Sequence, residues 1–181
     1  ARHPRTGLGH LELSGQIDRF TLFDGMAELS GWVPTVAIVS GPSFAGHASL
    51  AGFSDMVIAT RGSAIGMGGP PMVEAALGLT LTPQELAGVE MHERTGGIDL
   101  LVDDEPAAIQ SAKRYLEFLW DHPDGQADPS AEDIGDLIPE SGPYNIYPII
   151  QALVDSESIL ELRPNFAASV VTALARIDGR T

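Results

Sequence analysis

Backbone amide groups at a glycine turn are the most direct pointer to chemistry in this sequence. The segment Gly41-Pro42-Ser43-Phe44-Ala45-Gly46-His47 follows an apolar run, Pro34–Ser40, and opens a segment of small residues. This order predicts a strand, a tight turn and a helix start. The first N–H groups of a helix have no partner within it and lie at the positive end of the helix dipole, so they can stabilise negative charge on a substrate oxygen. The glycines can also serve steric needs alone, and the turn by itself favours that interpretation.

The segments around this turn alternate between helical and strand patterns. Residues 18–30 carry apolar side chains at helical spacing and end toward Gly31, which predicts an amphipathic helix. The apolar runs Pro34–Ser40 and Met56–Thr60 are rich in β-branched residues and suit strands buried on both faces of a sheet. A short helix between them completes a strand–helix–strand unit.

Three further helices are marked by their ends. Residues 69–78 begin with glycine and proline and finish at Gly78, the usual order at a helix start and end. Thr82-Pro83-Gln84-Glu85 is a capping box with proline at the first helical position. A helix over 105–120 is predicted to bury the face made by Ile109, Ala112, Leu116 and Leu119.

The segment Asp121–Pro143 differs in composition from the rest of the chain. It carries seven acids, four prolines, three glycines and no lysine or arginine, which predicts an interdomain linker, with a flexible surface loop as the alternative. Beyond it, residues 146–154 have a helical pattern, Ile159–Leu162 has a strand pattern, and 167–177 is apolar. These last residues are too few for a core of their own, so we expect them to pack on the first domain or on another chain, or to belong to a longer protein.

Composition excludes several classes of function. The net charge of −15 argues against nucleic acid or an anionic membrane as a partner, because both require clustered Lys and Arg. The absence of cysteine excludes disulfides, thiolate metal sites and a cysteine nucleophile. No signal peptide or long apolar run is visible, so we expect a cytoplasmic protein. The histidines show no metal-binding spacing with carboxylates, so no metal site is predicted.

Glycine and proline landmarks recur in a fixed order along the chain. The blocks are Gly41–Gly46, Asp55–Gly62 with its Arg-Gly corner, Gly68–Gly78 with Gly-Gly-Pro-Pro, Thr82–Gly97 with His92 and Gly96-Gly97, and the pair Tyr147–Leu162 and Phe166–Arg180. In order and spacing they resemble the carboxyltransferase (beta) subunits of biotin-dependent acyl-CoA carboxylases, of the propionyl-, acetyl- and methylcrotonyl-CoA carboxylase type, members of the crotonase superfamily. The resemblance covers roughly residues 20–181, and it rests on the set of blocks because each alone is weak.

The resemblance implies an α/β fold of the crotonase-like (ClpP/crotonase) kind, a superhelix of ββα units with the start of a second similar domain. Residues 1–120 would then be the C-terminal part of the N-terminal carboxyltransferase domain. Residues 121–143 would be the acidic linker, and 144–181 the beginning of the C-terminal domain. The family's Gly-Gly-Ala-Arg block is not reproduced in residues 1–19.

The resemblance also implies a reaction and its partners. Such subunits transfer a carboxyl group from carboxybiotin to the α-carbon of an acyl-CoA, through an enolate and without a metal. The biotin is carried by a partner protein, so the implied partners are acyl-CoA and the biotin carboxylase and biotin carboxyl carrier subunits. The implied assembly is a homo-oligomer built on dimers, up to a hexamer, with the active site between two subunits. The chain as given is expected not to transfer carboxyl groups alone.

The resemblance assigns residues to the site. The oxyanion donors map to the N–H groups of Ala45 and Gly46. Ala45 stands where the family usually has glycine, which backbone donors tolerate if φ stays negative. The substrate-binding residues are Gly41, Phe44, His47, Met67, Gly68, Gly69 and Pro71, of which Phe44 and His47 replace smaller residues and can alter the acyl pocket. Arg61 is expected to pair with a neighbouring carboxylate rather than with CoA phosphates, and His92 to have a structural role.

Two alternatives remain open from the sequence. Another crotonase-type enzyme, such as an acyl-CoA hydratase, isomerase or decarboxylase, would need side-chain acids or bases, for which Glu90, Glu93 and His92 are the candidates. A non-catalytic assembly or CoA-binding subunit would bind its partner or CoA without biotin-dependent turnover.

Overall fold

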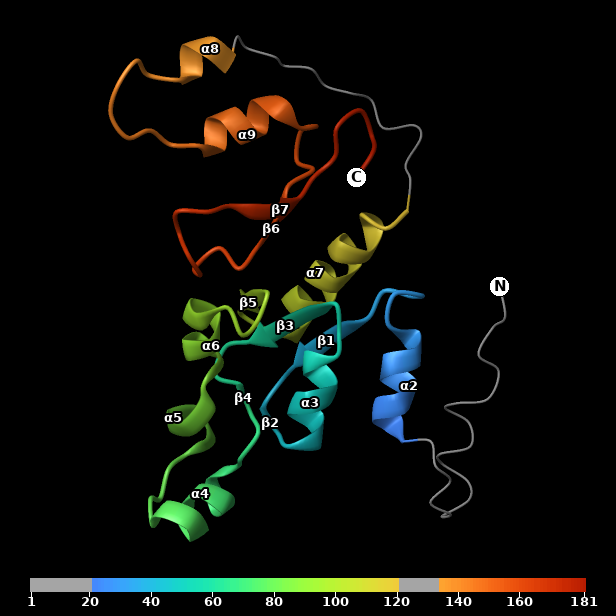
Figure 1. The fold of residues 1–181 in the computed structure, drawn as a ribbon, viewed down its shortest axis with the longest axis vertical. Helices are drawn as coiled ribbons and strands as arrows, with labels where there is room; N and C mark the ends of the chain where they lie inside the picture. Colours follow the sequence, from blue (N-terminus) through green and yellow to red (C-terminus); the bar gives the residue numbers. More distant parts are fainter. Residues whose placement is uncertain (1–20, 121–133) are drawn as a thin grey trace. The chain divides into compact units, whose positions relative to one another are not determined.

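A computed structural model describes residues 21–120 and 134–181, which form two compact units (Figure 1). Unit 1 ends at Ala108, and unit 2 runs from Ile109 to Thr181. The boundary falls inside helix α7 (Glu105–Glu117), which is the helix predicted over 105–120. The sequence places the first domain's end at residue 120, so the described structure divides the chain earlier. The assignment of the parts to two carboxyltransferase domains stays a prediction.

A parallel sheet in the order β1-β3-β5 forms the centre of unit 1. Its strands are β1 (Val36–Val39), β3 (Met56–Thr60) and β5 (Leu100–Val102). Ile38 pairs with Ile58, and Ile58 with Leu100. All five residues of β3 are buried, as expected for a central strand between two others. The strands predicted within Pro34–Ser40 and at Met56–Thr60 are confirmed, but burial on both faces holds only for β3, since Ile38 of β1 is 40% exposed. We did not predict β5, because a run of three residues shows no periodicity.

A second, two-stranded parallel sheet contains the glycine turn. It pairs β2 (Pro42–Phe44) with β4 (Ala64–Gly66), and Phe44 lies opposite Gly66. The prediction of one tight turn from Gly41 to the helix is therefore wrong, because a strand separates the two. Only a partner about twenty residues downstream makes these three residues a strand, and local sequence carries no signal for it.

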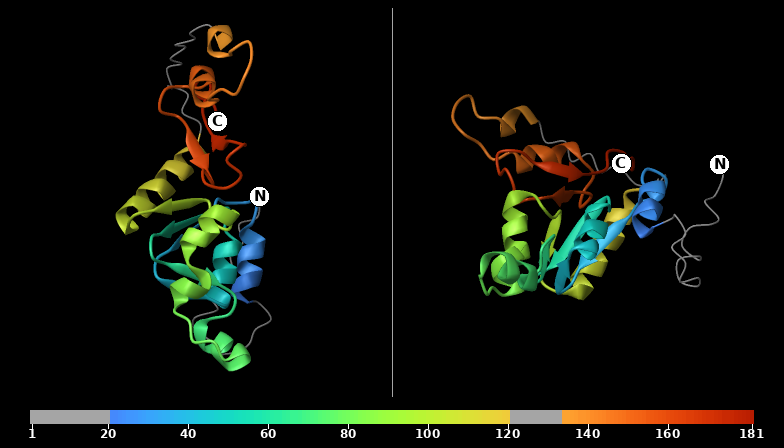
Figure 2. Two further views of the ribbon diagram at one scale, coloured as in Figure 1. Left: turned by 90° about the vertical axis from the view of Figure 1, so that its left-hand side faces the viewer. Right: turned by 60° about the horizontal axis from the view of Figure 1, so that its bottom comes forward.

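The helix end predicted at Gly78 and the helix start predicted at Thr82 are confirmed in unit 1. The helix predicted over 18–30 begins at Leu22, and the helix over Val89–Thr95 was not predicted. The helices of this unit are α2 (Leu22–Leu29), α3 (Gly46–Gly52), α4 (Pro70–Leu77), α5 (Pro83–Ala87) and α6 (Val89–Thr95). Thr21 with Asp24 and Thr82 with Glu85 form capping boxes, while Gly78 ends α4 with φ +69°. Figures 1 and 2 both show α2 beside α3, where Phe23 and Phe53 bring their ring centroids to 6.0 Å.

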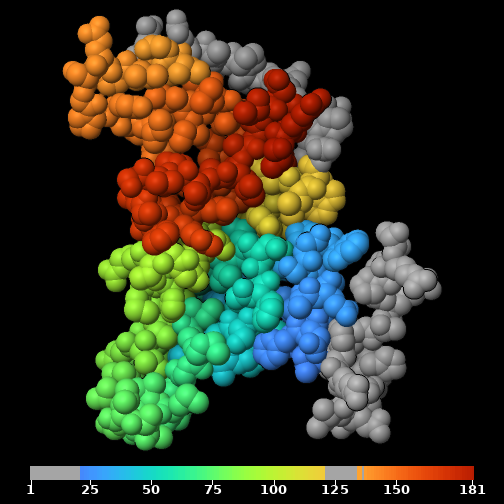
Figure 3. Space-filling view, in the orientation of Figure 1, coloured from blue at the N-terminus to red at the C-terminus, as the bar shows by residue number. Residues whose placement is uncertain are grey.

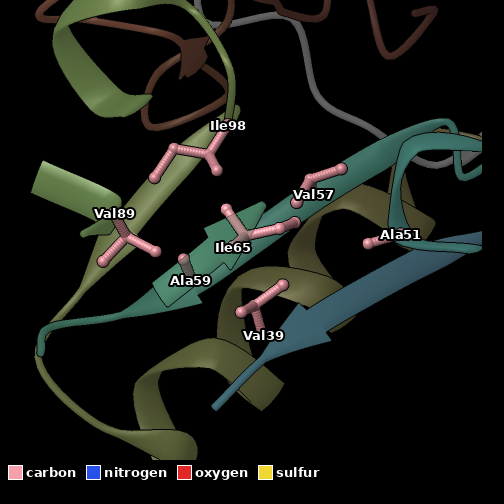
Figure 4. Close-up of a cluster of buried hydrophobic side chains, with 7 residues drawn as sticks. All are labelled: Val39, Ala51, Val57, Ala59, Ile65, Val89 and Ile98. Carbon is pink, nitrogen blue, oxygen red and sulfur yellow. The ribbon is translucent and has the colours of Figure 1, made fainter. Parts of the chain in front are cut away.

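The core of unit 1 joins both sheets and the helices around them (Figure 4). Its buried members are Val39, Ala51, Val57, Ala59, Ile65, Val89 and Ile98. Each valine or isoleucine buried in this way contributes roughly 1.5–3 kcal/mol. Because Ile65 of β4 and Val39 of β1 share this cluster, the core fixes the small sheet, and with it the glycine turn, against the large one.

The surface of unit 1 carries apolar side chains around α4. No residue of α4 is buried, and Met67, Met72, Leu77 and Leu79 are all exposed. Figure 3 shows this part of the chain as a green lobe at the surface. Local capping signals therefore define α4 more than burial does.

Besides the end of α7, the described residues of unit 2 form two short helices and one antiparallel strand pair. These are α8 (Ile134–Leu137), α9 (Tyr147–Leu153), β6 (Leu160–Leu162) and β7 (Thr172–Leu174). The predicted helix over 146–154 and the strand at Ile159–Leu162 are confirmed. Part of the predicted linker is instead helical, since α8 lies inside it. The rest of the acidic segment, residues 121–133, and residues 1–20 lie outside the described residues.

The end of α7 belongs structurally to unit 2. Arg114 Nη2 donates to the carbonyls of Glu157 and Ile159, at 3.1 and 2.5 Å. Arg176 Nη2 donates to the Glu117 carbonyl at 2.6 Å, and its guanidinium lies 5.0 Å from the centroid of the Phe118 ring.

The predicted buried face of α7 is partly wrong. Ile109 and Leu119 are 49% and 47% exposed, whereas Ala108 and Phe118 are buried. Helical spacing gives several overlapping apolar stripes, and tertiary packing selects one of them.

Within residues 21–120 and 134–181, no helix is long and apolar enough to cross a membrane. The cytoplasmic location stays a prediction.

Candidate functional site

Gly41 turns the chain from one sheet into the other. Its φ of +87° lies in the region that glycine adopts without steric cost. The Gly41 N–H donates to Ser63 Oγ at 2.8 Å, and the Gly41 carbonyl accepts the Ala64 N–H at 3.2 Å. This predicted site residue therefore sets the direction of β2, and no hydrogen-bonding group of its backbone is left over for a substrate.

Ala45 joins β2 to α3 in a strained conformation. Its φ of +54° and ψ of −120° contradict the expectation of a negative φ, and they match the first central residue of a type II′ turn, where glycine is favoured. A non-glycine residue held there costs roughly 1–3 kcal/mol. The Ala45 N–H donates to the Gly66 carbonyl at 3.0 Å, so its assignment as an oxyanion donor stays a prediction that requires this bond to open.

Gly46 is the first residue of α3, so its N–H has no acceptor within the helix. The first helical hydrogen bond runs from the Ser49 N–H to the Ala45 carbonyl, at 3.0 Å. The N–H groups of Gly46 and His47 precede that bond, and no side chain caps them. Within the part of the chain that the structure describes, neither N–H meets an acceptor outside α3. Two adjacent amides are thus available for an oxyanion.

Two of the predicted residues before α4, Met67 and Gly69, lie close to α3 and to Phe44. A Cβ on Gly69 would lie 3.6 Å from Phe44 Cγ, and the Ser49 hydroxyl is 3.6 Å from Met67 Sδ. The structure therefore brings Phe44 and Gly69 together, and it places Met67 against α3. A Cβ on Gly68 would lie 3.3 Å from Met72 Sδ.

The N-terminus of α4 itself offers few donors. Pro70 and Pro71 occupy its first two positions, and proline has no N–H. Any contact between a substrate anion and this helix start must therefore come from Gly68 and Gly69. Pro71 is exposed and remains a predicted substrate-binding residue through its ring alone.

His47 lies on the wall of a hollow that Pro42 and Ser43 of the glycine turn also line. A groove of about 410 Å³ runs along β1 between α2 and α3, and its lining includes Leu22, Met26, Ile38 and His47. The lining contains every residue of β1, so the groove follows the outer edge of that strand. Gly46, beside His47 in the chain, faces α2 as well, since a Cβ there would lie 3.8 Å from Phe23 Cζ.

Arg61 forms the expected ion pair at the corner after β3. Its Nε donates to Asp103 Oδ1 at 2.8 Å, and this contact raises the pKa of the guanidinium. Next to it, the Gly62 N–H donates to Glu90 Oε1 at 3.0 Å and holds the pKa of that carboxyl below its usual value, with a smaller contribution from the Arg61 charge. Glu90 is thus occupied by the corner, which fits a structural role better than a general base.

His92 packs against the end of its own helix. The Gly97 N–H donates to the His92 carbonyl at 2.8 Å, and a Cβ on Gly97 would lie 2.6 Å from His92 Nδ1. Gly97 is therefore required for the ring to occupy this place. His92 Nε2 is buried and meets no hydrogen-bond partner among the described residues. Those residues also hold no group of three His, Asp or Glu side chains that could bind a metal.

Sequence reasoning missed the two hydroxyls that hold the glycine turn. Thr60 ends β3 and Ser63 follows it, and both are buried. The available signal was two hydroxyl residues at the end of an apolar strand, where parallel strands place their functional groups. That signal does not say which backbone group the hydroxyls will meet.

Comparison with known proteins identifies the family to which this sequence and fold are similar. Residues 6–181 match the carboxyl transferase domain family. The chain is 31% identical to the methylmalonyl-CoA carboxyltransferase 12S subunit of Propionibacterium freudenreichii over 172 residues, 88% of this chain and 33% of that one. It is 29% identical to the biotin-dependent acetyl-/propionyl-coenzyme A carboxylase beta6 subunit of Mycobacterium tuberculosis over 184 residues, 97% of this chain and 37% of that one.

Solved structures give the same result. A single-chain, multi-domain long-chain acyl-CoA carboxylase superposes with a TM-score of 0.80 at 38% identity, over 87% of this chain and 16% of that one. The transcarboxylase 12S structure with methylmalonyl-CoA and methylmalonic acid bound superposes with a TM-score of 0.75 at 29% identity, over 87% of this chain and 33% of that one.

The chain spans about a third of the length of the curated relatives that it matches. The match nevertheless covers nearly all of this sequence, and the parallel sheets agree with the crotonase-like fold expected from its glycine landmarks. The chain therefore belongs to the carboxyl transferase domain family and has the α/β, crotonase-like fold of carboxyltransferases.

Proposed function

We propose that this chain is part of the carboxyltransferase component of a biotin-dependent acyl-CoA carboxylase. The protein moves a carboxyl group to the α-carbon of an acyl-CoA. The observation that carries the proposal is the family match over residues 6–181, supported by relatives whose names describe acyl-CoA carboxylases and carboxyltransferases. Acyl-CoA is the substrate, and a biotin carboxyl carrier with its biotin carboxylase supplies the carboxyl group.

The amides at the start of α3 suit the oxygen of a thioester enolate. Loss of a proton from the α-carbon places negative charge on the thioester oxygen, and fixed N–H donors stabilise that charge without reorganising. The Gly46 N–H is such a donor, and the His47 N–H beside it is the second one available. The assigned Ala45 N–H can join only if the bond to Gly66 opens, so we expect Gly46 to contribute most.

Biotin chemistry requires a second set of donors. Carboxybiotin supplies the carboxyl group, and the ureido oxygen that remains needs its own amides. Gly69 lies against Phe44 of the turn, and Gly68 precedes it, so these two glycines could contact either the thioester or the biotin end of a substrate. The family's second amide motif is not in this sequence, so the biotin site is expected to require further protein. The homo-oligomer built on dimers remains part of this proposal, consistent with the hexamer assembly described for transcarboxylase 12S.

Calorimetric titration of the purified chain with propionyl-CoA and with free CoA tests the proposal. Gly46→Pro removes the N–H, whereas Gly46→Ala keeps it and adds a Cβ that has room, 3.8 Å from Phe23. We expect propionyl-CoA to bind more tightly than CoA to the wild type and to Gly46→Ala, and this preference to vanish in Gly46→Pro. Proline disfavours the conformation of the residue before it, so both variants are also made on an Ala45→Gly background, and circular dichroism checks folding.

Two results would count against the proposal. Equal binding of propionyl-CoA and CoA by a folded wild-type chain would mean that the amides recognise no thioester, which favours a CoA-binding or assembly subunit. Loss of acyl-CoA preference on replacing Glu90 or His92 by alanine, with Gly46→Pro unaffected, would favour a crotonase-type enzyme that uses side-chain acids and bases.

A further inference from the structure

Two buried hydroxyls lie behind the glycine turn, and the proposed chemistry does not use them directly. Ser63 is 1% exposed and Thr60 is 6% exposed, so neither can touch a substrate. Their oxygens lie 2.9 Å apart. Burying a hydroxyl is costly unless hydrogen bonds satisfy it. The groups that these hydroxyls bind therefore indicate what they do.

The hydroxyls close a chain of hydrogen bonds around the end of β1. The Gly41 N–H donates to Ser63 Oγ at 2.8 Å, and the Thr60 hydroxyl donates to the Val39 carbonyl at 3.5 Å. Each hydroxyl has one proton. Since the Thr60 proton is used on Val39, Ser63 must donate to Thr60. Every proton then has one acceptor, and the chain of bonds holds the backbone on both sides of Ser40.

We propose that Ser63 is a positioning residue for the amides at the start of α3. The inference rests on the proposed function for its catalytic meaning. β2 is only three residues long and pairs with a single strand, β4. Its beginning is held by the bond between Gly41 and Ser63, and its end by the bond between the Ala45 N–H and the Gly66 carbonyl.

Placement of the Gly46 amide then depends on both ends of β2. Ala45 precedes Gly46 directly and is held in a strained conformation, so a release of β2 at Gly41 gives the turn freedom to relax. A displacement of about 1 Å in a catalytic group can cost about 100-fold in rate. Ser63 thus acts through Gly41 and β2, without contacting the substrate.

The pair of strands β1 and β3 offers a matched control at the end opposite Thr60. The Thr35 N–H and hydroxyl both donate to Asp55 Oδ2 at 2.8 Å, where β1 and β3 begin. Thr35→Val removes one hydroxyl from this clasp and leaves the glycine turn unchanged. Any effect that only reflects looser pairing of β1 with β3 should appear in this variant too.

The test compares Ser63→Ala, Thr60→Val, Thr60→Ser and Thr35→Val with the wild type by amide hydrogen exchange. In Ser63→Ala and Thr60→Val we expect exchange of the Ala45 N–H to accelerate about tenfold, the factor typical of losing one buried hydrogen bond. The Val57 N–H in β3 reports on global opening and should not change. Thr60→Ser keeps the hydroxyl and should restore slow exchange, while Thr35→Val should leave Ala45 unaffected.

Titration with propionyl-CoA and CoA adds the functional measurement. We expect the preference for propionyl-CoA to fall in Ser63→Ala and Thr60→Val and to be retained in Thr35→Val. Unchanged Ala45 exchange in a folded Ser63→Ala variant, or equal acceleration in Thr35→Val, would overturn the inference. If Ser63→Ala does not fold, the nearly isosteric Thr60→Val decides. If the wild type shows no acyl preference, the proposed function fails and the exchange data still decide the role of Ser63.

Discussion

Units 1 and 2 reach stability by different means. Unit 1 buries β-branched residues in a central strand, and Ile58 is 0% exposed. In the described residues of unit 2, the buried hydrophobic side chains are Phe118, Ile149 and Leu160, and arginine side chains bind backbone carbonyls around them. Apolar burial leaves a periodic pattern in the sequence, whereas a contact between an arginine and a carbonyl leaves none. The core packing of the first unit is therefore readable from its sequence, whereas in the second unit only individual elements, α9 and β6, are.

The turns of the two units also differ in how far the sequence predicts them. Among the described residues, unit 1 uses glycine at its positive-φ positions, namely Gly31, Gly41, Gly62, Gly78 and Gly96, with Ala45 as the exception. Unit 2 places Glu157, Arg163, Ala167 and Asp178 at positive φ, alongside Gly142 and Gly179. Positive φ is uncommon outside glycine, so turns of the first kind can be predicted and turns of the second kind cannot. The one such exception in unit 1 adjoins the proposed oxyanion donor.

The largest expected effect comes from removing a central side chain of unit 1. Ile58→Ala should lower the free energy of unfolding by about 2–5 kcal/mol, because the side chain is fully buried and leaves a cavity. The control, Ile109→Ala, should change it by less than about 0.5 kcal/mol, because that side chain is half exposed. Urea denaturation followed by circular dichroism measures both. Similar losses in the two variants would show that Ile109 is buried in solution, against the comparison drawn above.

An intermediate effect is expected from the arginine contacts of unit 2. Arg176→Met removes the hydrogen bond to the Glu117 carbonyl and the contact with the Phe118 ring, and should cost about 1.5–3 kcal/mol. The loss should appear as faster amide exchange in β6 and β7, with β1 and β3 unchanged. Arg180→Met serves as the control, since its side chain is exposed. If exchange in β6 and β7 did not change, apolar packing would hold unit 2, and the contrast between the units would disappear.

The smallest expected effect concerns backbone strain. Ala45→Gly should raise the free energy of unfolding by about 1 kcal/mol, as relief of strain exceeds the entropy that glycine loses on folding. Ala167→Gly, at φ +52° in unit 2, is the matched variant and should stabilise by a similar amount. Thermal unfolding monitored by circular dichroism compares the two. A destabilised Ala45→Gly variant would mean that the Ala45 methyl makes contacts worth more than the strain.

Much of unit 1 follows from short-range signals. Thr21 and Thr82 mark helix starts through their capping boxes, Gly78 marks a helix end, and the apolar run Met56–Thr60 marks the central strand. The strand β2 was not predicted, because its three residues form a strand only by pairing with β4. The role of Ser63 was not predicted, because no residue near it in the sequence indicates that its hydroxyl will accept the Gly41 N–H.

The sequence by itself determined the family, the two long apolar strands and the capped helices of unit 1, and the segment that carries the proposed donor. Those properties depend on composition, periodicity and glycine landmarks, which are local. Tertiary structure alone decided that Ala45 adopts a positive φ, that its N–H binds Gly66, and that α7 continues into unit 2. Each depends on contacts between groups far apart in the chain, and these contacts outweigh the conformational preference of the single residue.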